Sequence, residues 1–155
     1  IIPKIVNVDF SKRDHLSMET EFISNCPECG FELKKNEGEA NHYCLNYNFC
    51  QPQVSGRIQH FISRKAMDID GLGAETVNLL VENKLINNYS DIYRLKAEDL
   101  LGLERMAEKS SENLINGVLM SKQISFYRVL YALGIRHVGV TVAKKLAQHI
   151  TILML

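Results

Sequence analysis

The sequence predicts a mainly α-helical protein in which a small four-cysteine zinc finger precedes a domain of helix-hairpin-helix repeats, with a short β-strand at the N-terminus. Two observations support this prediction. The four cysteines form two close pairs with the spacing of a metal site, and a helical pattern recurs three times in the second half of the chain. We therefore divide the chain into residues 1–23, 24–56 and 57–155.

The first segment, residues 1–23, contains one predicted strand. β-Branched and polar residues mix from Ile5 to Phe10, and a polar linker follows from Ser11 to Thr20. A single strand is not stable alone, so we expect it to belong to a sheet that is mostly absent from this chain. The chain starts without methionine and ends on an apolar run, so we interpret both ends as cuts in a longer protein.

The second segment, residues 24–56, carries all the cysteines of the chain, which are Cys26, Cys29, Cys44 and Cys50. The pairs C-x2-C and C-x5-C are separated by a polar loop of fourteen residues, and each pair can bind an ion from one tight turn. Four thiolates complete a tetrahedral shell without water, which predicts a structural zinc ion. Thiolate ligands are typical of a reducing cytoplasm.

Two alternatives for the cysteines stay open at this point. They could form two disulfides, although a C-x2-C pair has poor geometry for a stabilising disulfide and nothing else suggests secretion. Thiolates could also bind iron instead of zinc. His42 lies two residues before Cys44 and could replace a cysteine as ligand, but with four thiolates available we interpret it as a surface histidine.

The third segment, residues 57–155, is predicted to contain three copies of a helix-hairpin-helix unit. The hairpins begin at Ile69, Leu103 and Ile135, which are 34 and 32 residues apart. Each copy reads apolar, two variable, apolar, small, and a helix follows. The inward positions of these helices are Val77, Leu80, Ser111, Leu114, Ala143 and Leu146. The first helices of the second and third units are expected near 95–101 and 126–133.

The small residue that ends each hairpin predicts a phosphate contact. The next helix would begin there with unpaired N–H groups facing outward, which favours an anion. Two such units would hold one strand of a duplex each, without reading its sequence. The third copy has Arg136 before Gly139 and Lys144 behind it, whereas Arg105 and Ala107 replace both glycines of the second copy. The alternative is a helical bundle whose glycines serve only as turns.

The formal net charge is zero, but the charges are unevenly distributed. Residues 1–56 contain five basic and eight acidic side chains, whereas residues 57–155 contain thirteen basic and ten acidic ones. No acidic residue follows Glu112, so the last part of the chain can present a basic face. A solvated helical surface is the alternative. No apolar run approaches the roughly 20 residues that a membrane helix needs.

The motifs resemble those of bacterial NAD-dependent DNA ligases, and they follow in the same order. The matching stretches are Cys26-Pro27-Glu28-Cys29-Gly30, the C-x14-C-x5-C remainder, Met67-Asp68-Ile69-Asp70-Gly71-Leu72-Gly73, Ala107-Glu108-Lys109-Ser110 and Gly134-Ile135-Arg136-His137-Val138-Gly139. The resemblance covers essentially the whole chain. It implies a zinc finger between a helix-hairpin-helix domain and an oligonucleotide-binding barrel, of which the opening from Ile2 to Val6 would be the last part.

The resemblance implies a DNA-binding fragment rather than the catalytic part of the enzyme. Enzymes of this family attack NAD with the lysine of a Lys-x-Asp-Gly motif. In this chain Asp70-Gly71 could end such a motif, but the position of the lysine is occupied by Asp68. We therefore expect this chain alone to be inactive, with NAD and magnesium bound by other domains of a bacterial, cytoplasmic enzyme of DNA replication and repair. Candidate DNA contacts are Gly71, Gly73, Lys109, Arg136, Gly139 and Lys144.

The expected partners are nicked double-stranded DNA, bound independently of sequence, and the remaining domains of the same ligase chain, with no membrane. Two other functions remain as alternatives. The chain could be a helix-hairpin-helix module of another DNA-repair protein, or a structural unit that docks to other proteins. A salt titration of duplex binding separates the last alternative from the others, because phosphate contacts weaken steeply with salt.

Overall fold

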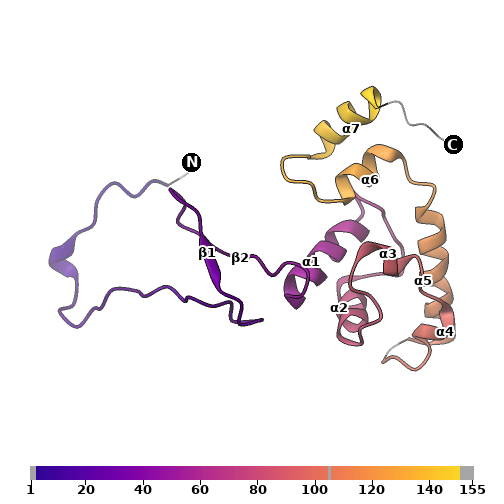
Figure 1. Ribbon diagram of the computed structural model, residues 1–155, viewed down its shortest axis with the longest axis horizontal. Helices are drawn as coiled ribbons and strands as arrows, with labels where there is room; N and C mark the ends of the chain where they lie inside the picture. Colours follow the sequence, from indigo (N-terminus) through magenta and orange to yellow (C-terminus); the bar gives the residue numbers. More distant parts are fainter. Residues whose placement is uncertain (1–2, 105, 151–155) are drawn as a thin grey trace.

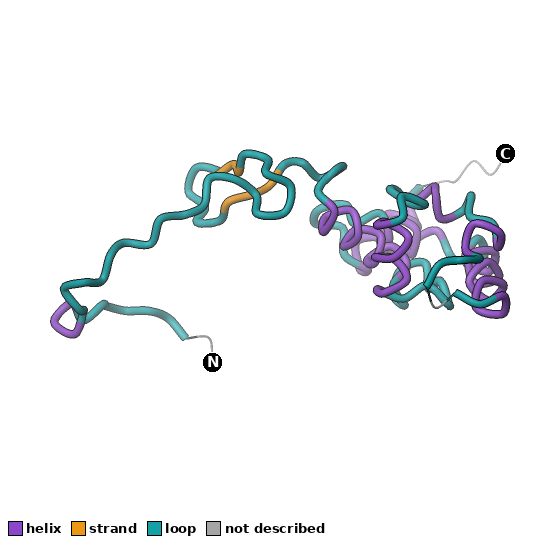
Figure 2. The backbone as a smooth tube through the Cα atoms, turned by 90° about the horizontal axis from the view of Figure 1, so that it is seen from below, coloured by secondary structure: helices purple, strands orange, loops and turns teal. Residues whose placement is uncertain are grey.

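The computed structural model describes residues 3–104 and 106–150. Figure 1 shows an extended N-terminal segment and a small two-stranded finger on one side, and a group of packed helices on the other. Helix α1 (Gln51–Ile62) connects the two parts, and Figure 2 shows the same separation from a second direction. Two residues of the predicted motifs, Ile2 and Arg105, lie outside the described residues.

The predicted N-terminal strand is not formed among the described residues. Residues 3–9 have no regular structure, and a short 3-10 helix, η1, spans Phe10–Lys12. Ile5 and Val6 are 86% and 90% exposed. A strand needs a hydrogen-bonded neighbour, and the sheet of the described residues consists of the two finger strands alone, with which this segment does not pair.

The finger contains a short antiparallel hairpin where the sequence predicts only a polar loop. Strand β1 (Leu33–Lys35) pairs with β2 (His42–Cys44), with Leu33 opposite Cys44. Gly38, in the connection between them, has a φ of +76°, a conformation that glycine adopts readily. The pairing brings the third cysteine back towards the first pair, so the hairpin closes the finger.

The rest of the chain is helical, as predicted. The helices after α1 are α2 (Ala74–Glu82), α3 (Tyr89–Ile92), α4 (Ala97–Leu100), α5 (Glu108–Ser121), α6 (Phe126–Ala132) and α7 (Val140–His149). Even the one-turn helix α3 has a complete capping box, in which the Asn88 side chain accepts from the Asp91 N–H and the Asp91 carboxylate accepts from the Asn88 N–H. The domain boundary expected between residues 56 and 57 falls inside α1.

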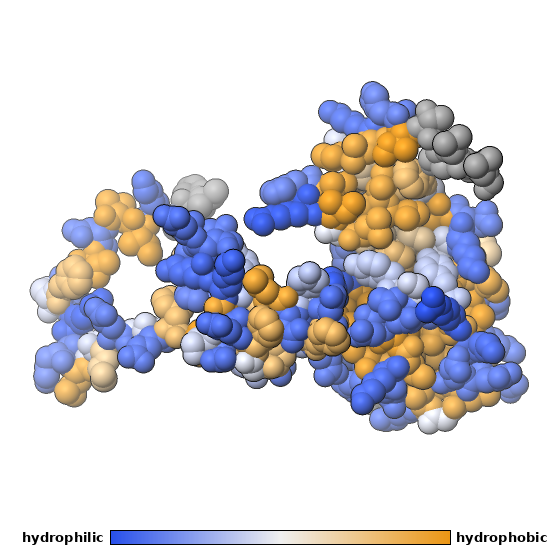
Figure 3. Space-filling model, in the orientation of Figure 1, coloured by the Kyte–Doolittle hydropathy of each residue, from blue (hydrophilic) through white to orange (hydrophobic). Residues whose placement is uncertain are grey.

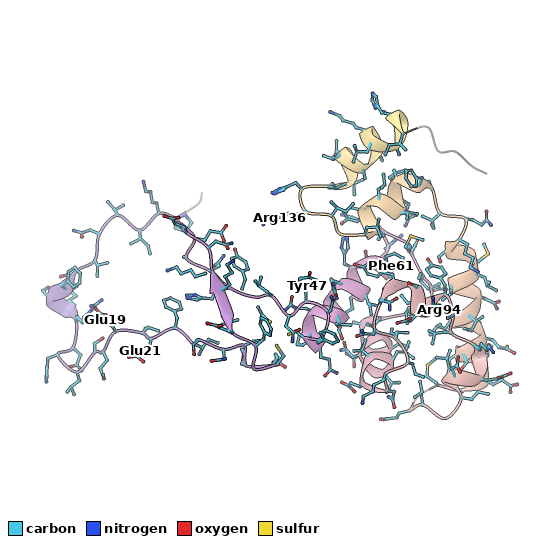
Figure 4. All side chains as sticks on the ribbon, in the orientation of Figure 1. Glu19, Glu21, Tyr47, Phe61, Arg94 and Arg136 are labelled. Carbon is cyan, nitrogen blue, oxygen red and sulfur yellow. The ribbon has the colours of Figure 1, made fainter. Side chains whose placement is uncertain are left out.

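One apolar core holds α1 to α6 together. Its largest fully buried side chains are Ile58, Leu80, Ile86, Ile92, Leu100 and Leu114. Phe61, labelled in Figure 4, stacks on Tyr89 with ring centroids 4.5 Å apart. All the predicted inward positions are buried except Leu146, which is 39% exposed. That prediction was wrong because α7 packs mainly against α6 and does not reach the core.

The α6–α7 hairpin leaves apolar side chains uncovered. Leu133, Ile135, Leu146 and Ile150 are each between 39% and 49% exposed. Figure 3 shows hydrophobic surface gathered over this part of the molecule. The hairpin is held to the rest of the domain through contacts between α1 and α6. None of the helices in the described ranges has the length and apolar character needed to cross a membrane.

Glycines allow the first hairpin to pack closely against α5. Gly71 has a φ of +78°, and a Cβ at this position would lie 3.1 Å from the Cα of Leu114. From the opposite side, a Cβ on Gly117 would lie 2.2 Å from the carbonyl oxygen of Asp70. The backbones of the turn and of the helix therefore touch, and no side chain fits between them.

Candidate functional site

The four cysteines converge on one point. Their Sγ atoms all lie within 4.8 Å of one another, with Cys26 and Cys50 4.0 Å apart and Cys29 and Cys44 3.6 Å apart. A zinc–sulfur bond of about 2.3 Å implies sulfur atoms about 3.8 Å apart at the corners of a tetrahedron. The donor set and its spacing therefore fit zinc. The four cysteines are free thiols, so the two-disulfide alternative is not what the structure contains.

Local turns place each thiol pair. In the first pair, the Cys26 N–H donates to the Phe31 carbonyl at 2.8 Å and the Gly30 N–H donates to the Cys26 carbonyl at 2.9 Å. Gly30 permits this turn because its φ is +69°. In the second pair, the Cys50 N–H donates to the Asn46 carbonyl at 2.8 Å. Cys50 is also the N-cap of α1, so the last thiol is part of the helical framework.

The pKa values of the thiols in the cluster are shifted in opposite directions. A hydrogen bond from the Phe31 backbone lowers the pKa of Cys29 to about 7, so this thiolate forms readily near neutral pH. Burial raises the pKa of Cys44 to about 11 and also raises the pKa of Cys50. A coordinated metal ion reverses this effect, since a coordinating thiol is deprotonated outright. His42 lies outside the cluster, and its ring stacks on Phe22 at 5.0 Å.

The three hairpins end in the same way, as the repeat predicts. Gly73, Ala107 and Gly139 are the N-caps of α2, α5 and α7, with φ between −91° and −77° and ψ between 165° and 176°. None of these caps has a side-chain hydrogen bond to the first turn, so the N–H groups at these helix ends are not satisfied by a capping side chain. At the equivalent earlier position of the first and third turns, Gly71 and His137 both have positive φ, at 78° and 67°.

The candidate DNA contacts differ in what surrounds them. Gly73 and Gly139 are open, with no atom within 4 Å of a Cβ built on either. Gly71 faces the backbone of α5, so its lack of a side chain is already explained by internal packing. Lys109 is exposed in the first turn of α5. Gly73, Lys109 and Gly139 lie at the starts of three different helices, α2, α5 and α7.

The third hairpin carries the basic side chains. Arg136 is exposed and projects from the turn before α7, as Figure 4 shows. Hydrogen bonds from Tyr43 and Asn36 lower the pKa of Glu39, and the charge of Arg136 lowers it further, so this arginine acts on the finger hairpin. The Lys144 ammonium lies 5.2 Å from the centroid of the Tyr127 ring, which fixes it against α6.

Sequence reasoning missed three residues that join parts of the molecule. Gln53 and Arg57 donate from α1 to the Cys44 and Tyr47 carbonyls of the finger, at 3.1 Å and 2.6 Å. Their positions three and seven residues after Cys50 are the available signal, because these positions share one helix face. Arg128 is one of the thirteen basic residues of the third segment, but its charge is not free. Instead its Nε donates to the Ala66 carbonyl at 2.7 Å and attaches α6 to the end of α1.

Comparisons with known proteins agree with these features. The profile of the NAD-dependent DNA ligase C4 zinc finger domain matches residues 25–51, and that of the helix-hairpin-helix motif matches residues 128–153. The chain is 66% identical over 149 residues to a DNA ligase of Christiangramia forsetii and 64% identical over 149 residues to one of Flavobacterium johnsoniae. A DNA ligase of Bacteroides fragilis is 54% identical over 148 residues.

Each of these alignments covers 96% of this chain and 22% of the relative, so the chain spans about a fifth of the length of the curated relatives it matches. The matched regions include all four cysteines and the third hairpin. The resemblance that the sequence motifs indicate is thereby confirmed. The chain belongs to the family of bacterial NAD-dependent DNA ligases, of which it contains the four-cysteine zinc finger and helix-hairpin-helix region.

Proposed function

We propose that this chain is the part of a DNA ligase that holds nicked duplex DNA through its backbone phosphates. Adenylyl transfer from NAD, with magnesium, would take place on other domains of the enzyme during replication and repair in the bacterial cytoplasm. The observation that carries this proposal is the set of three helix N-termini without capping side chains, each of which follows one copy of the repeated sequence pattern. Contacts of this kind hold any sequence equally well.

The domain assignment belongs to the same proposal. Residues 1–23 would be the last part of an oligonucleotide-binding barrel with its linker, and the exposure of residues 3–23 is what a segment separated from its sheet would show. Residues 24–56 would be the finger, in which the four Sγ atoms hold one structural zinc ion. Residues 57–155 would be the helix-hairpin-helix domain. Zinc would supply folding free energy and no step of the reaction.

The charge distribution favours the third hairpin as the main DNA contact. Asp70 lies in the first hairpin turn and Glu104 in the second, where Arg105 follows it, whereas the third turn and the helix after it carry Arg136, Lys144 and Lys145 and no acidic residue. The carboxylates oppose phosphate binding at the first two turns, and the basic residues strengthen it at the third. Duplex DNA should therefore be bound unequally by the three units.

A steric series at Gly139 tests the proposed approach of phosphate. The residue has an ordinary φ of −77° and open space around it, so a side chain there does not strain the turn, contrary to what its position in the motif suggests. We expect Gly139→Ala to weaken binding of a nicked duplex modestly and Gly139→Val to weaken it strongly, with at most about 1 kcal/mol lost in helix stability from the poorer cap. Fluorescence anisotropy and thermal unfolding measure the two effects. Equal affinity across the series would place the phosphate elsewhere.

A charge comparison tests which part of the chain binds DNA. Replacing Lys144 with alanine should remove about one phosphate contact, weaken all duplex sequences alike and reduce the salt slope by roughly one. The same substitution at Lys34, on β1 in the acidic part of the chain, should have much less effect. Both variants are checked for helix content first, because Lys144 also lies over Tyr127. If Lys34→Ala weakened duplex binding more than Lys144→Ala, the finger would be the part that binds DNA.

The exposed apolar surface of α6 and α7 favours a second candidate, a unit that docks to protein. The salt titration separates the two functions. A phosphate-binding domain loses duplex affinity steeply between low and moderate salt, whereas a docking unit has no duplex affinity to lose. Measured duplex binding with a slope near zero would contradict the proposed function.

A further inference from the structure

The finger and the helical domain meet at one helix. Cys50 is both the fourth thiol of the cluster and the N-cap of α1, so the chain passes directly from the metal site into α1. Further along α1, Val54, Ile58, Phe61 and Ile62 are buried in the core. Helix α1 is thus an extension of the core that reaches the metal site, and its N-terminus determines where the finger starts.

Two side chains on the same stripe of α1 reach back to the finger. Gln53 and Arg57 follow Cys50 by three and seven residues, which is the spacing of one helix face. Gln53 Nε2 donates to the Cys44 carbonyl at 3.1 Å, and Arg57 Nη2 donates to the Tyr47 carbonyl at 2.6 Å. The first acceptor is the carbonyl of the third cysteine itself, at the end of β2, and the second lies between the third and fourth cysteines, so each donor attaches α1 to the metal-binding part of the finger.

Arg57 makes further contacts at this junction. Its guanidinium lies 5.8 Å from the centroid of the ring of Tyr47, which Figure 4 labels, and the two form a cation–π arrangement. Its Nε is buried and, among the described residues, has no hydrogen-bond partner. A buried donor without a partner is unfavourable, so the side chain keeps this position because its other contacts, to Tyr47, outweigh that cost.

Packing alone does not hold the junction. A cavity of about 350 Å³ separates Asn48 and Phe49 of the finger loop from Ile58 and Tyr89 of the helical domain. Phe49 is 78% exposed and does not fill this space. Arg136 also attracts Glu39 of the finger, but Arg136 is exposed and salt screens such pairs. Backbone hydrogen bonds hold only the residues next to the link, from the Cys50 N–H to Asn46 and from the Val54 N–H to Cys50, so the two side-chain hydrogen bonds are the contacts that attach α1 to the finger further from it.

We propose that Gln53 and Arg57 are positioning residues that fix the orientation of the zinc finger relative to the hairpins. Cys50, Gln53 and Arg57 together make the finger and α1 one rigid unit, so that the finger, once folded on its metal, faces the duplex at a set angle. The statement that the finger faces the duplex rests on the proposed function, whereas the statement that the junction is rigid does not. Without the two donors, the finger would remain folded but would turn about the link at residues 50–51.

The test measures interdomain orientation by NMR. Residual dipolar couplings are recorded on the zinc-loaded 155-residue chain, and separate alignment tensors are fitted to the amides of the finger and of the helices. In the native chain we expect one common tensor. In Arg57→Ala with Gln53→Ala we expect a reduced tensor for the finger, while its chemical shifts away from the junction stay unchanged. Lys65→Ala, which removes an exposed charge beyond the end of α1, is the matched control and should keep the common tensor.

Single variants keep the proposal falsifiable if the double variant loses its finger fold. Gln53→Ala removes one hydrogen bond and leaves the Arg57 contacts, so we expect a partial reduction of the alignment tensor of the finger. Arg57→Lys retains a donor and a cation near Tyr47, and it should retain more of the common alignment than Arg57→Ala. A common tensor in both alanine single variants would overturn the proposal. Fluorescence anisotropy with a nicked duplex separates the failure of this proposal from the failure of the proposed function. A native chain that does not bind DNA contradicts the proposed function, whereas the NMR result on the rigid junction is unaffected.

Discussion

Replacing Cys29 with serine is expected to abolish zinc binding and unfold the finger, while the helices from α2 to α6 stay folded. The finger has few buried side chains of its own, since apart from Cys26 and Cys50 its residues before α1 are exposed or half-buried. Structural zinc contributes about 10–16 kcal/mol of apparent binding free energy in finger peptides, which is the largest single contribution available to this segment. The helical core lies outside the finger and does not depend on it.

The measurement combines elemental analysis with spectroscopy. The native chain should contain one zinc per molecule, and the variant well under one. NMR shifts should collapse for residues 24–49 and persist for the core helices, with far-UV circular dichroism nearly unchanged. A native chain that lacks zinc while its finger remains folded would contradict the prediction. So would a variant whose helices unfold together with the finger.

Replacing Gly117 with alanine is expected to cost about 3 kcal/mol of unfolding free energy, at the upper end of the usual range for overpacking. A Cβ there would lie 2.2 Å from the Asp70 carbonyl oxygen and 3.0 Å from its carbon. These are backbone atoms of the first hairpin turn, so no side chain can rotate away and the whole turn must move from α5. For a chain of this size, the loss corresponds to a fall in Tm of about 6–12 °C.

The same substitution at Gly56 is the matched control. Gly56 also lies inside a helix, α1, but nothing stands within 4 Å of a Cβ built on it. Because alanine has a higher helix propensity than glycine, Gly56→Ala should stabilise the chain by about 0.5–1 kcal/mol. Thermal and denaturant unfolding of the two variants should therefore shift in opposite directions. Shifts of the same sign and size would mean that the first hairpin does not rest directly on α5.

The metal site and the hairpin ends could be predicted from the sequence because both depend on local spacing. A C-x2-C turn and a C-x5-C turn each place two thiols together whatever the rest of the chain does. In the same way, a small residue after a turn becomes a helix N-cap through local backbone geometry, as Gly73, Ala107 and Gly139 show. Periodicity also identified the buried side of α2 and α5, where Val77, Leu80 and Leu114 are fully buried.

The errors have a common cause, since each concerns a residue whose partner is distant in the sequence. The segment from Ile5 to Phe10 has strand-like composition but no neighbouring strand to pair with among the described residues. Leu146 has a buried position in the repeat, yet α7 does not reach the core. Arg128 contributes to the basic excess of the third segment, but it binds the Ala66 carbonyl 62 positions earlier in the chain.

The sequence by itself determined the class of fold, the four thiols of the metal centre and the start of each repeated helix, because these follow from turns and spacings a few residues long. Tertiary structure alone decided which glycines are needed for packing and how the finger meets the helices. Gly71 touches the backbone of α5, and Gly117 touches Asp70. Gln53 and Arg57 attach α1 to the finger loop. Such contacts join residues brought together by the whole chain, and no local pattern records them, because the free energy of close packing depends on which surfaces the completed core leaves adjacent.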